Sequence, residues 1–462
     1  MARGKKKESA LTPEEKLAQA LVPDWEQPYK VPNNWKWIIL GNLVDIHRGA
    51  SPRPIKAYIT EDETGVNWIK IGDTDSGKYV TRVSEKITTE GARKSVFVEE
   101  GTLLLSNSMS FGRPYILKVD GCIHDGWLAI TPSMAFNKEY LYYALLASEW
   151  YFEQVAVGTA VRNLNSERVA GTPIPCPPIA EQQRIVDRIE YLFAKLDEAK
   201  EKAQYVLDSF ETRKAAILHK AFTGELTAKW RAEHGVNLDG WQQTTIGKES
   251  LLITKGASPR WQGITYTDDK SQTLFVTSEN VRDGYLDLTK EKYLDNRINE
   301  IQRRSVLQKG DVLVNIVGAS IGRAAIFDLE CLANTNQAVC LIRLKGSVVN
   351  RFLCYYLNSP VALTYYGENK VETARANISL TNISDMGIAL PSVVEQHEIV
   401  SILDSLFAKE QQAKEAAEAV LEKIDLLKKS ILARAFRGEL GTNDPTEESA
   451  VELLREILKG DI

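Results

Sequence analysis

The side chains with the clearest potential for chemistry are cations on two short loops rich in glycine and proline. The loops read Arg48-Gly-Ala-Ser-Pro-Arg53 and Lys255-Gly-Ala-Ser-Pro-Arg260, and Lys56 follows the first of them. Cations on such loops can reach a phosphate group or the edge of a guanine base. The competing interpretation is a charged surface turn. We take the loops as a prediction of contact with DNA.

Matched polar residues occur further along each half of the chain. Asn107 and Asn315 end predicted strands, and Arg113 and Arg323 each come directly after a glycine. Asparagine can bond to the edge of adenine and arginine to the edge of guanine, so all four are candidate contacts to bases. The competing interpretation is that these side chains hold the turns in which they lie.

Three other features are interpreted as structural. Asn163 and Asn377 lie in the linkers before two long helices, where an amide caps backbone groups more often than it reads bases. Thr12 and Glu15 form a capping box for a short helix. The basic tail Arg3–Lys7 is expected to be a solvated end, and contact with phosphates is its alternative role.

Residue patterns for catalysis or metal binding are missing from the sequence. There is no GxxxxGK[ST] phosphate loop, no HExxH and no CxxC pair. The five cysteines are interpreted as free thiols in a reducing compartment. The acidic pairs Asp73 with Asp75 and Asp268 with Asp269 are interpreted as solvated turn carboxylates rather than as a nuclease site. We therefore expect no catalytic residue, cofactor site or metal site in this chain.

Composition describes an ordinary globular protein. The 462 residues are 44% hydrophobic and 26% charged, and this length predicts two to four domains. No apolar run is long enough for a membrane span and no signal peptide is evident, so we expect a cytoplasmic protein without membrane contact. The formal net charge of −5 counts against a nucleic-acid partner, because such proteins usually carry excess Lys and Arg.

The elements that must position these residues are revealed by an internal repeat. Pro177-Pro-Ile-Ala-Glu-Gln-Gln-Arg-Ile-Val186 aligns with Pro391-Ser-Val-Val-Glu-Gln-His-Glu-Ile-Val400 at an offset of 214 residues. The same offset aligns two further motifs, LFAK and AFxGEL, without a gap. Two motifs at one fixed offset are hard to obtain from similar composition alone, so the repeat indicates a duplicated unit.

Each copy of the repeat carries a long helix with one apolar face. Apolar or small residues recur alternately four and three positions apart, which is the heptad pattern of a coiled coil. Arg213 and Glu410 are exceptions that occupy seam positions where the other copy has Leu427 and Leu196. Proline before each helix and Gly224 or Gly438 after it are start and stop signals. Each helix is expected to be about 40 residues, or roughly 60 Å long, and to pack antiparallel against the other as a rigid spacer.

The segments between the helices are predicted to be β-rich domains with some helix. Strand candidates begin at Trp35, Trp68 and Thr102 in the first domain and at Thr273 and Asp311 in the second. A tyrosine-rich helix closes each domain. The two domains share a few short sequence motifs in the same order but little other sequence, which indicates a constant helical frame that carries two different domains.

These motifs resemble the specificity subunits of type I restriction-modification systems. The resemblance rests on the PPxxEQ helix start at Pro177–Gln182 and its weaker form at Pro391–Gln396, followed by LFAK and AFxGEL. Val31-Pro-Asn-Asn-Trp35 and Leu226-Thr-Ala-Lys-Trp-Arg231 also resemble the family. It implies that each globular domain is a target-recognition domain for one half of a bipartite, asymmetric DNA site.

The resemblance also implies partners. The helices would set the gap between the half-sites and dock two methyltransferase subunits, and restriction subunits would then join. S-adenosylmethionine, ATP and Mg are expected on those partners. The chain itself lacks the Asn- or Asp-Pro-Pro-aromatic motif of an adenine methyltransferase. It is therefore expected to read DNA without being an enzyme.

The resulting fold prediction is of the α+β class. Two mixed α/β target-recognition domains are separated by two long helices that pack as an antiparallel coiled coil, with a pseudo-twofold internal repeat. The expected segments are an N-terminal tail and short helix (1–34), a first target-recognition domain (35–176), a central helix (177–231), a second target-recognition domain (241–390), a C-terminal helix (391–440) and a tail with a short helix (441–462).

Two other functions remain open at this stage. The chain could be a coiled-coil scaffold that binds proteins and never DNA, because a long apolar helix face is by itself a protein-binding feature. It could also be a self-sufficient nuclease with an unrecognised site. Cleavage of DNA by the purified chain with Mg²⁺ would favour the nuclease, and an absence of DNA binding with or without methyltransferase would favour the scaffold.

Overall fold

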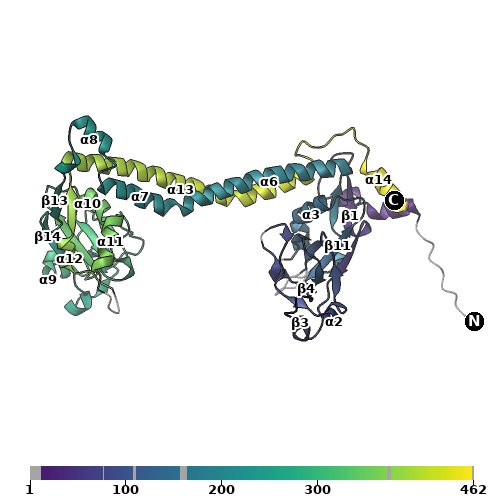
Figure 1. Ribbon diagram of the computed structural model, residues 1–462, viewed down its shortest axis with the longest axis horizontal. Coiled ribbons are helices and arrows are strands. Elements are labelled where there is room, and N and C mark those ends of the chain that lie inside the picture. Colours follow the sequence, from purple (N-terminus) through teal and green to yellow (C-terminus); the bar gives the residue numbers. More distant parts are fainter. Residues whose placement is uncertain (1–11, 76, 108–110, 157–163, 372–375, 460–462) are drawn as a thin grey trace, which may run out of the picture. The chain divides into compact units, whose positions relative to one another are not determined.

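A computed structural model describes residues 12–75, 77–107, 111–156, 164–371 and 376–459 of the chain. The chain forms two compact units, one made of Met1–Lys202 with Val420–Ile462 and the other of Ala203–Ala419. Each unit contains one globular domain and a part of both long helices (Figure 1). The helices Ile179–Asp208 and Val393–Phe436 each contribute to both units, and the segment boundaries expected from the sequence stay a prediction.

The globular domain of the first unit contains two five-stranded sheets. One has the order β3-β6-β4-β10-β7 and the other β2-β11-β8-β9-β5. The strands of the first sheet are β3 (Ile59–Thr60), β6 (Lys86–Ile87), β4 (Val66–Ile69), β10 (Gly121–Ile123) and β7 (Val96–Val98). Those of the second are β2 (Val44–Arg48), β11 (Trp127–Pro132), β8 (Leu103–Ser106), β9 (Pro114–Leu117) and β5 (Tyr79–Val80). Only the β4–β10 and β5–β9 pairs are parallel among the described strands of this domain.

The second unit repeats this framework with four strands in each sheet. The sheet orders are β15-β17-β16-β20 and β14-β21-β18-β19. The strands are β15 (Tyr266–Thr267), β17 (Tyr293–Leu294), β16 (Thr273–Val276), β20 (Ala333–Thr335), β14 (Ser250–Lys255), β21 (Val339–Leu344), β18 (Val312–Asn315) and β19 (Ala324–Ile326). The parallel pair β16–β20 takes the place of β4–β10. The two domains therefore share one strand order, to which the first adds β5 and β7.

A short antiparallel ribbon joins each domain to its long helix. β1 (Lys36–Ile39) pairs with β12 (Pro173–Cys176), and β13 (Gln242–Thr245) pairs with β22 (Gly387–Leu390). The other helices of the first domain are α2 (Thr89–Ala92), α3 (Lys138–Ala147), α4 (Glu149–Val155) and α5 (Ser166–Ala170). Those of the second are α9 (Ile298–Ile301), α10 (Asn350–Leu357), α11 (Pro360–Asn369) and α12 (Leu380–Asp385).

The long helices are α6 (Ile179–Asp208), α7 (Phe210–Phe222) and α13 (Val393–Phe436). Gly224 and Gly438 follow them in the left-handed conformation that ends a helix. The prediction of one uninterrupted helix in the first copy was wrong, since it divides at Ser209. The Ser209 hydroxyl donates to the carbonyl of Tyr205, 2.5 Å away, and such a bond to the preceding turn bends helices.

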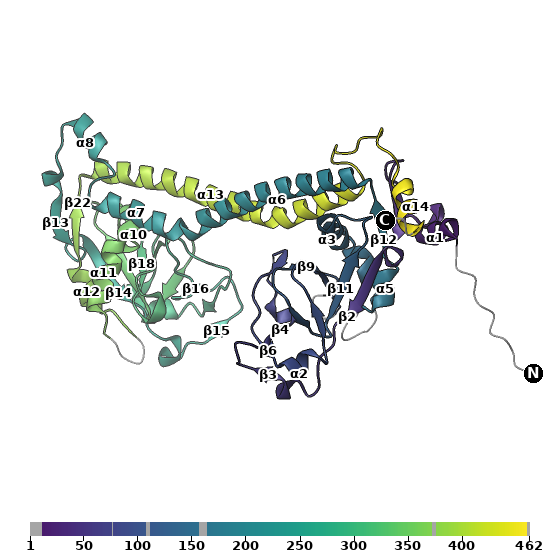
Figure 2. The ribbon, with the colours of Figure 1, turned by 45° about the vertical axis from the view of Figure 1, so that its right-hand side comes forward.

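Within each unit the two helices run antiparallel. In the first unit Arg184 contacts Glu447 and Asp197 contacts Lys428, so residue numbers increase along one segment while they decrease along the segment that it contacts. In the second unit Arg213 contacts Glu410, and Thr227 contacts Glu395. The two exceptions in the predicted heptad seam, Arg213 and Glu410, therefore pair with each other. Figure 2 shows the paired helices beside the sheets of each unit.

The cores bind the helix ends to the domains. In the first unit Ile185 and Ile189 of α6 and Phe436 of α13 pack in the same cluster as the closing helix α3. In the second unit Leu218 of α7 and Leu403 of α13 pack with α10 in the same way. Among the described residues, no helix combines the length and the apolar character needed to cross a membrane.

The two ends of the described chain meet in the first unit. Helix α1 (Pro13–Ala20), which begins with the predicted Thr12–Glu15 capping box, packs against α14 (Ala450–Lys459). Leu17 and Leu454 from these helices belong to the first core. In the second unit the chain passes from α7 through α8 (Ala228–His234) into β13 instead.

Candidate nucleic-acid interface

The loops Gly49–Arg53 and Gly256–Arg260 share the sequence Gly-Ala-Ser-Pro-Arg, and we call them the GASPR loops. They have the same place in both domains because their glycine permits close contact with the neighbouring part of the chain. A Cβ on Gly49 would collide with the carbonyl oxygen of His124, and one on Gly256 would collide with that of Thr335. The first carbonyl belongs to the turn that leads from β10 to β11, and the second ends β20, directly before the turn to β21. The shared sequence therefore fixes where each loop lies and leaves the residues after it free to differ.

In the first domain Asp125 holds the loop. The Ser51 hydroxyl donates to Oδ1 of Asp125 over 2.7 Å, and Nε of Arg48 donates to the Asp125 carbonyl over 3.0 Å. The Arg53 guanidinium lies 3.5 Å from Oδ2 of the same carboxylate. Burial raises the pKa of Asp125, but the Ser51 hydrogen bond and the electrostatic effect of His124, Arg48 and Arg53 outweigh it, so the net pKa lies below its usual value. Asp125 therefore stays ionised and aligns two predicted contact residues.

His124 contributes to the same arrangement through both ring nitrogens. Nδ1 accepts a hydrogen bond from the backbone N–H of Gly126 over 2.8 Å, which leaves Nε2 to donate to Asp125, 3.0 Å away. The imidazole lies edge to face with the buried ring of Trp68, at a centroid distance of 6.0 Å. The imidazole therefore links the Asp125 carboxylate to the buried side chain of Trp68.

A surface hollow of about 860 Å³ lies beside this loop. It is lined by the loop from Ser51 to Lys56 together with Trp68, Lys70, Glu85, His124 and Asp125. Lys70 and Glu85 form an ion pair of 2.6 Å at its wall. The Arg53 side chain is 82% exposed. Of the predicted contacts, Arg53 and Lys56 thus line this hollow, and Arg48 binds the carbonyl of Asp125 at its wall.

The corresponding loop of the second domain has a different tip. Lys255 ends β14, and Arg260 lies in the 3₁₀ turn Pro259–Gln262 beside Trp261, which is 80% exposed. The turn beneath the loop offers the Asn336 amide, whose Oδ1 accepts from the Ala338 N–H over 3.0 Å, in place of a carboxylate. Lys255 and Arg260 have no ion-pair partner within the part of the chain that the structure describes.

Asn107 and Asn315 are buried and not at a surface. The Asn107 amide donates to the carbonyl of Asp125 over 3.0 Å, and that of Asn315 donates to the carbonyl of Ser278 over 3.0 Å. Both side chains tie a strand end to the neighbouring loop. The structural interpretation therefore fits their positions better than the prediction that they read adenine edges, because a buried amide presents no donor to a base.

Arg113 and Arg323 follow glycines in the left-handed conformation, Gly112 and Gly322. The Arg113 guanidinium lies 5.4 Å from the centre of the Tyr115 ring. Arg323 lines a hollow within the second unit. Direct base contact by Arg113 and Arg323 stays a prediction.

The linkers before the long helices contain short helices with caps of their own. Asn165 caps α5 and Ser379 caps α12, whereas Asn377 makes main-chain bridges to Val317 and Val371. Asn163 and the basic tail Arg3–Lys7 lie outside the described residues. Cys122, Cys176, Cys340 and Cys354 are buried free thiols and Cys331 is exposed. No cluster of metal-binding side chains is found among the residues described.

The PPxxEQ motif joins each domain to its helix. Gln182 accepts from the backbone N–H of Asn137 and donates to the carbonyls of Ala135 and Pro177, at 2.8, 2.8 and 3.0 Å. Gln396 makes the same set of bonds to Val349, Ser347 and Pro391, at 2.8, 3.1 and 3.0 Å. The glutamine thus fixes the closing helix of the domain against the start of the long helix.

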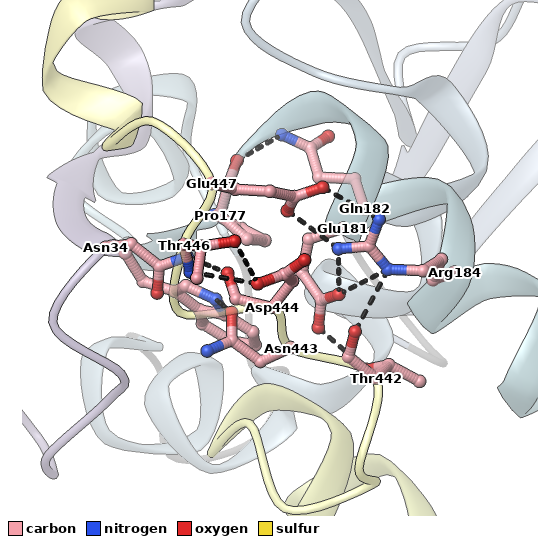
Figure 3. Close-up of polar contacts among 11 residues, drawn as sticks. Asn34, Pro177, Glu181, Gln182, Arg184, Thr442, Asn443, Asp444, Thr446 and Glu447 are labelled. Atoms are coloured by element: carbon pink, nitrogen blue, oxygen red, sulfur yellow. Dashed lines mark hydrogen bonds and ion pairs between the residues drawn. The ribbon is translucent and has the colours of Figure 1, made fainter.

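The glutamate of the motif binds the segment that follows the other long helix. Glu181 accepts from Thr442 over 2.7 Å and pairs with Arg184, which also reaches Glu447 (Figure 3). In the second unit Glu395 accepts from Thr227, Arg231 and Trp241, at 2.8, 2.8 and 3.1 Å. Sequence reasoning treated this motif only as a helix start. The Glu-Gln pair is the part of the motif that recurs unchanged at one offset, and this was the signal of a larger role.

Comparisons with known proteins agree with these features. The family described as "Type I restriction modification DNA specificity domain" matches residues 32–205 and 269–423. The type I restriction enzyme EcoBI specificity subunit of Escherichia coli is 30% identical over 66% of this chain and 66% of its own length. The StySPI specificity subunit of Salmonella potsdam is 25% identical over 89% of this chain and 90% of its own.

Two solved structures share the fold. The HsdS subunit from Thermoanaerobacter tengcongensis has a TM-score of 0.65 at 21% identity, and the match covers 90% of this chain and all of that one. A chain from a study of complex assembly in a type I R-M system has a TM-score of 0.62 at 21% identity, over 89% of this chain. The curated relatives are named specificity subunits, in agreement with the prediction that such a chain is not the enzyme of its system.

Proposed function

Because the chain belongs to the type I restriction-modification DNA specificity family, we propose that it reads a bipartite, asymmetric DNA site with its two globular domains. The observation that carries the proposal is that both domains have one strand order and place the GASPR loop on the same turn, while the residues at the loop tip differ. A shared framework with unlike tips is what two readers of unlike half-sites require.

The cations at the loop tips supply the chemistry of recognition. Arg53 and Lys56 in the first domain and Lys255 and Arg260 in the second present N–H donors on exposed loops. An arginine can bond to both acceptors of a guanine edge, and either residue can bind a phosphate. Asp125 is the positioning residue of the first loop, because it holds both Arg48 and Arg53. The second loop lacks this carboxylate, which supports a different half-site.

The long helices would serve as a coiled-coil spacer and as the docking frame for two methyltransferase subunits and the restriction subunits. The support is the antiparallel pairing within each unit and the identical EQ junctions that orient each domain on its helix. S-adenosylmethionine, ATP and Mg would be bound by those partners. Helix pairs fix a distance between readers much as dimer geometry fixes half-site spacing in other DNA-binding proteins.

The experiment is a domain exchange read by the methylation pattern of the host genome. Replacing residues 36–158 by those of a relative is expected to change one half of the methylated motif and leave the other half and the gap intact. The matched control replaces the second domain, which should change the opposite half. An unchanged motif after either exchange would refute reading by these domains. Loss of all methylation together with lost co-purification of the methyltransferase would indicate failed assembly, which DNA-independent pull-down measures separately.

A further inference from the structure

A second hollow, of about 870 Å³, lies entirely within the second unit. On one side it is lined by the helix pair, with Phe210 and Lys214 from α7 and Phe407 and Lys414 from α13. On the other side it is lined by the globular domain, with the loop Arg282–Asp287, Arg323 and the helix α10. We call this hollow the α7–α13 groove. None of the predicted loop contacts except Arg323 belongs to it.

Cations predominate in the groove. The charged residues that line it are Lys214, Arg282, Arg323, Arg351 and Lys414 against Glu211, Asp283 and Asp287. Arg282 pairs with Asp287 at 3.3 Å and Arg351 pairs with Asp404 at 2.8 Å. For Lys214, Arg323 and Lys414, by contrast, no ion pair occurs in the described ranges of the chain. All three side chains are half-buried, so their charge acts in a recess with restricted access to water.

The equivalent corner of the first unit neutralises its own charge. Lys428 lies 214 residues after Lys214 in the repeat, and it pairs with Asp197 at 2.5 Å. Lys78 enters the corner from the domain and pairs with Glu139 and Glu190. A shared frame therefore has its lysine paired in one unit and unpaired in the other. The difference marks Lys214 as available to an external anion, and Lys414, whose Nζ lies 5.1 Å from the centre of the Phe210 ring, adds a second cation without an ion pair in the described ranges.

We propose that the α7–α13 groove binds phosphate groups of the DNA backbone beside the half-site that the second domain reads, an inference that rests on the proposed function. Lys214 and Lys414 come from the helical frame, which does not change with the target, so their contacts would carry no sequence information. Phosphate contacts position a protein on DNA in this way, whereas base contacts specify the site. The formal net charge of −5 is no obstacle, because phosphates respond to local cations.

The test is the salt dependence of DNA binding by the full chain in complex with its methyltransferase. The duplexes contain the motif found from the methylation pattern, or a scrambled version of it. Each lost phosphate contact lowers the slope of log K against log salt by about 0.9. The double variant Lys214→Gln, Lys414→Gln is expected to lower that slope by about 2 and to weaken both duplexes by the same factor. Glutamine keeps much of the side-chain length, and circular dichroism verifies the fold.

Lys428→Gln is the matched control, since it removes the equivalent lysine of the first unit while the groove stays intact. It is expected to leave the slope unchanged. An unchanged slope in the double variant, with normal preference for the motif, would overturn the groove but not the proposed function. A loss of affinity confined to the motif duplex would mean that the two lysines read bases, and it would also overturn the proposed phosphate binding. Loss of methyltransferase binding with unaltered salt dependence would mean that the α7–α13 groove is a protein-binding surface instead. A parent complex without preference for any split motif would overturn the proposed function itself.

Discussion

The Glu395 cluster offers the sharpest test of how the helical frame is held together. The Glu395 and Arg231 side chains are 4% and 8% exposed and lie 2.8 Å apart. Glu395 also accepts from Thr227 and from the Trp241 indole, and Arg231 donates to the carbonyl of Gly224. Glu395→Gln keeps the shape but removes the charge, and it turns one acceptor into a donor that must face another donor.

The magnitude follows from the burial of the pair. Removing one partner of a buried ion pair costs about 3–5 kcal/mol, because the other charge is left without compensation. Arg231 keeps its bonds to Thr227 and Gly224, so we expect about 2–4 kcal/mol for Glu395→Gln. Every 1.4 kcal/mol is about tenfold in an equilibrium, so amides in 224–241 should exchange with deuterium roughly 30- to 700-fold faster.

Hydrogen exchange read by mass spectrometry measures this locally, and the twin position supplies the control. Glu181→Gln should cost less, because its partner Arg184 is 37% exposed and retains Glu447. A further variant, Arg231→Leu, removes the cation, and Glu395→Gln in that background should cost little. Equal costs at Glu181 and Glu395, or no coupling between Glu395 and Arg231, would refute the assignment of this energy to the buried charge pair.

Three further outcomes can be measured. Burial raises the pKa of Glu181, so the folded chain holds this proton more tightly, and the free energy of unfolding falls as pH rises from about 4.3 through the raised pKa. The difference in unfolding free energy between the parent and Glu181→Gln, measured by urea denaturation, should therefore shrink as pH rises. A difference that stays constant with pH would contradict this. Glu410→Leu alone should speed hydrogen exchange around the helix break, whereas Arg213→Leu with Glu410→Leu should restore protection, because the double change leaves no charge without its partner. Gly256→Ala should lower discrimination at one half-site about tenfold and Gly49→Ala at the other, which competition binding would show; loss at both halves from one change would contradict independent loops.

The frame could be predicted from the sequence because its signals repeat. The heptad spacing, the motifs at one offset and the glycine stops all express local backbone preferences. The two seam exceptions were visible individually, but their contact was not predicted, since antiparallel register is set by packing at the two ends. The division at Ser209 coincides with a hydroxyl that bonds to the carbonyl of the preceding turn, and hydrophobic periodicity does not encode such a bond.

The candidate interface was predicted less completely. The GASPR loops were found from residue type, yet Asp125, which holds the first loop, lies far along the chain in a turn without a motif. Asn107 and Asn315 have a side chain that can bond to an adenine edge, but both are buried at the end of a strand, where they bond to the carbonyls of a neighbouring loop. The cations Lys214 and Lys414 lie in a helical pattern rich in charge, where only the three-dimensional arrangement shows which described residues have no ion pair.

The meeting of α1 with α14 sets an order for biogenesis. The first core includes Leu17 near one end of the described chain and Leu432, Phe436 and Leu454 near the other. A ribosome delivers the residues of the second unit before it releases the last of these side chains, so the domain that is synthesised first is completed last. Until then its apolar surface stays open to chaperones and to other nascent chains.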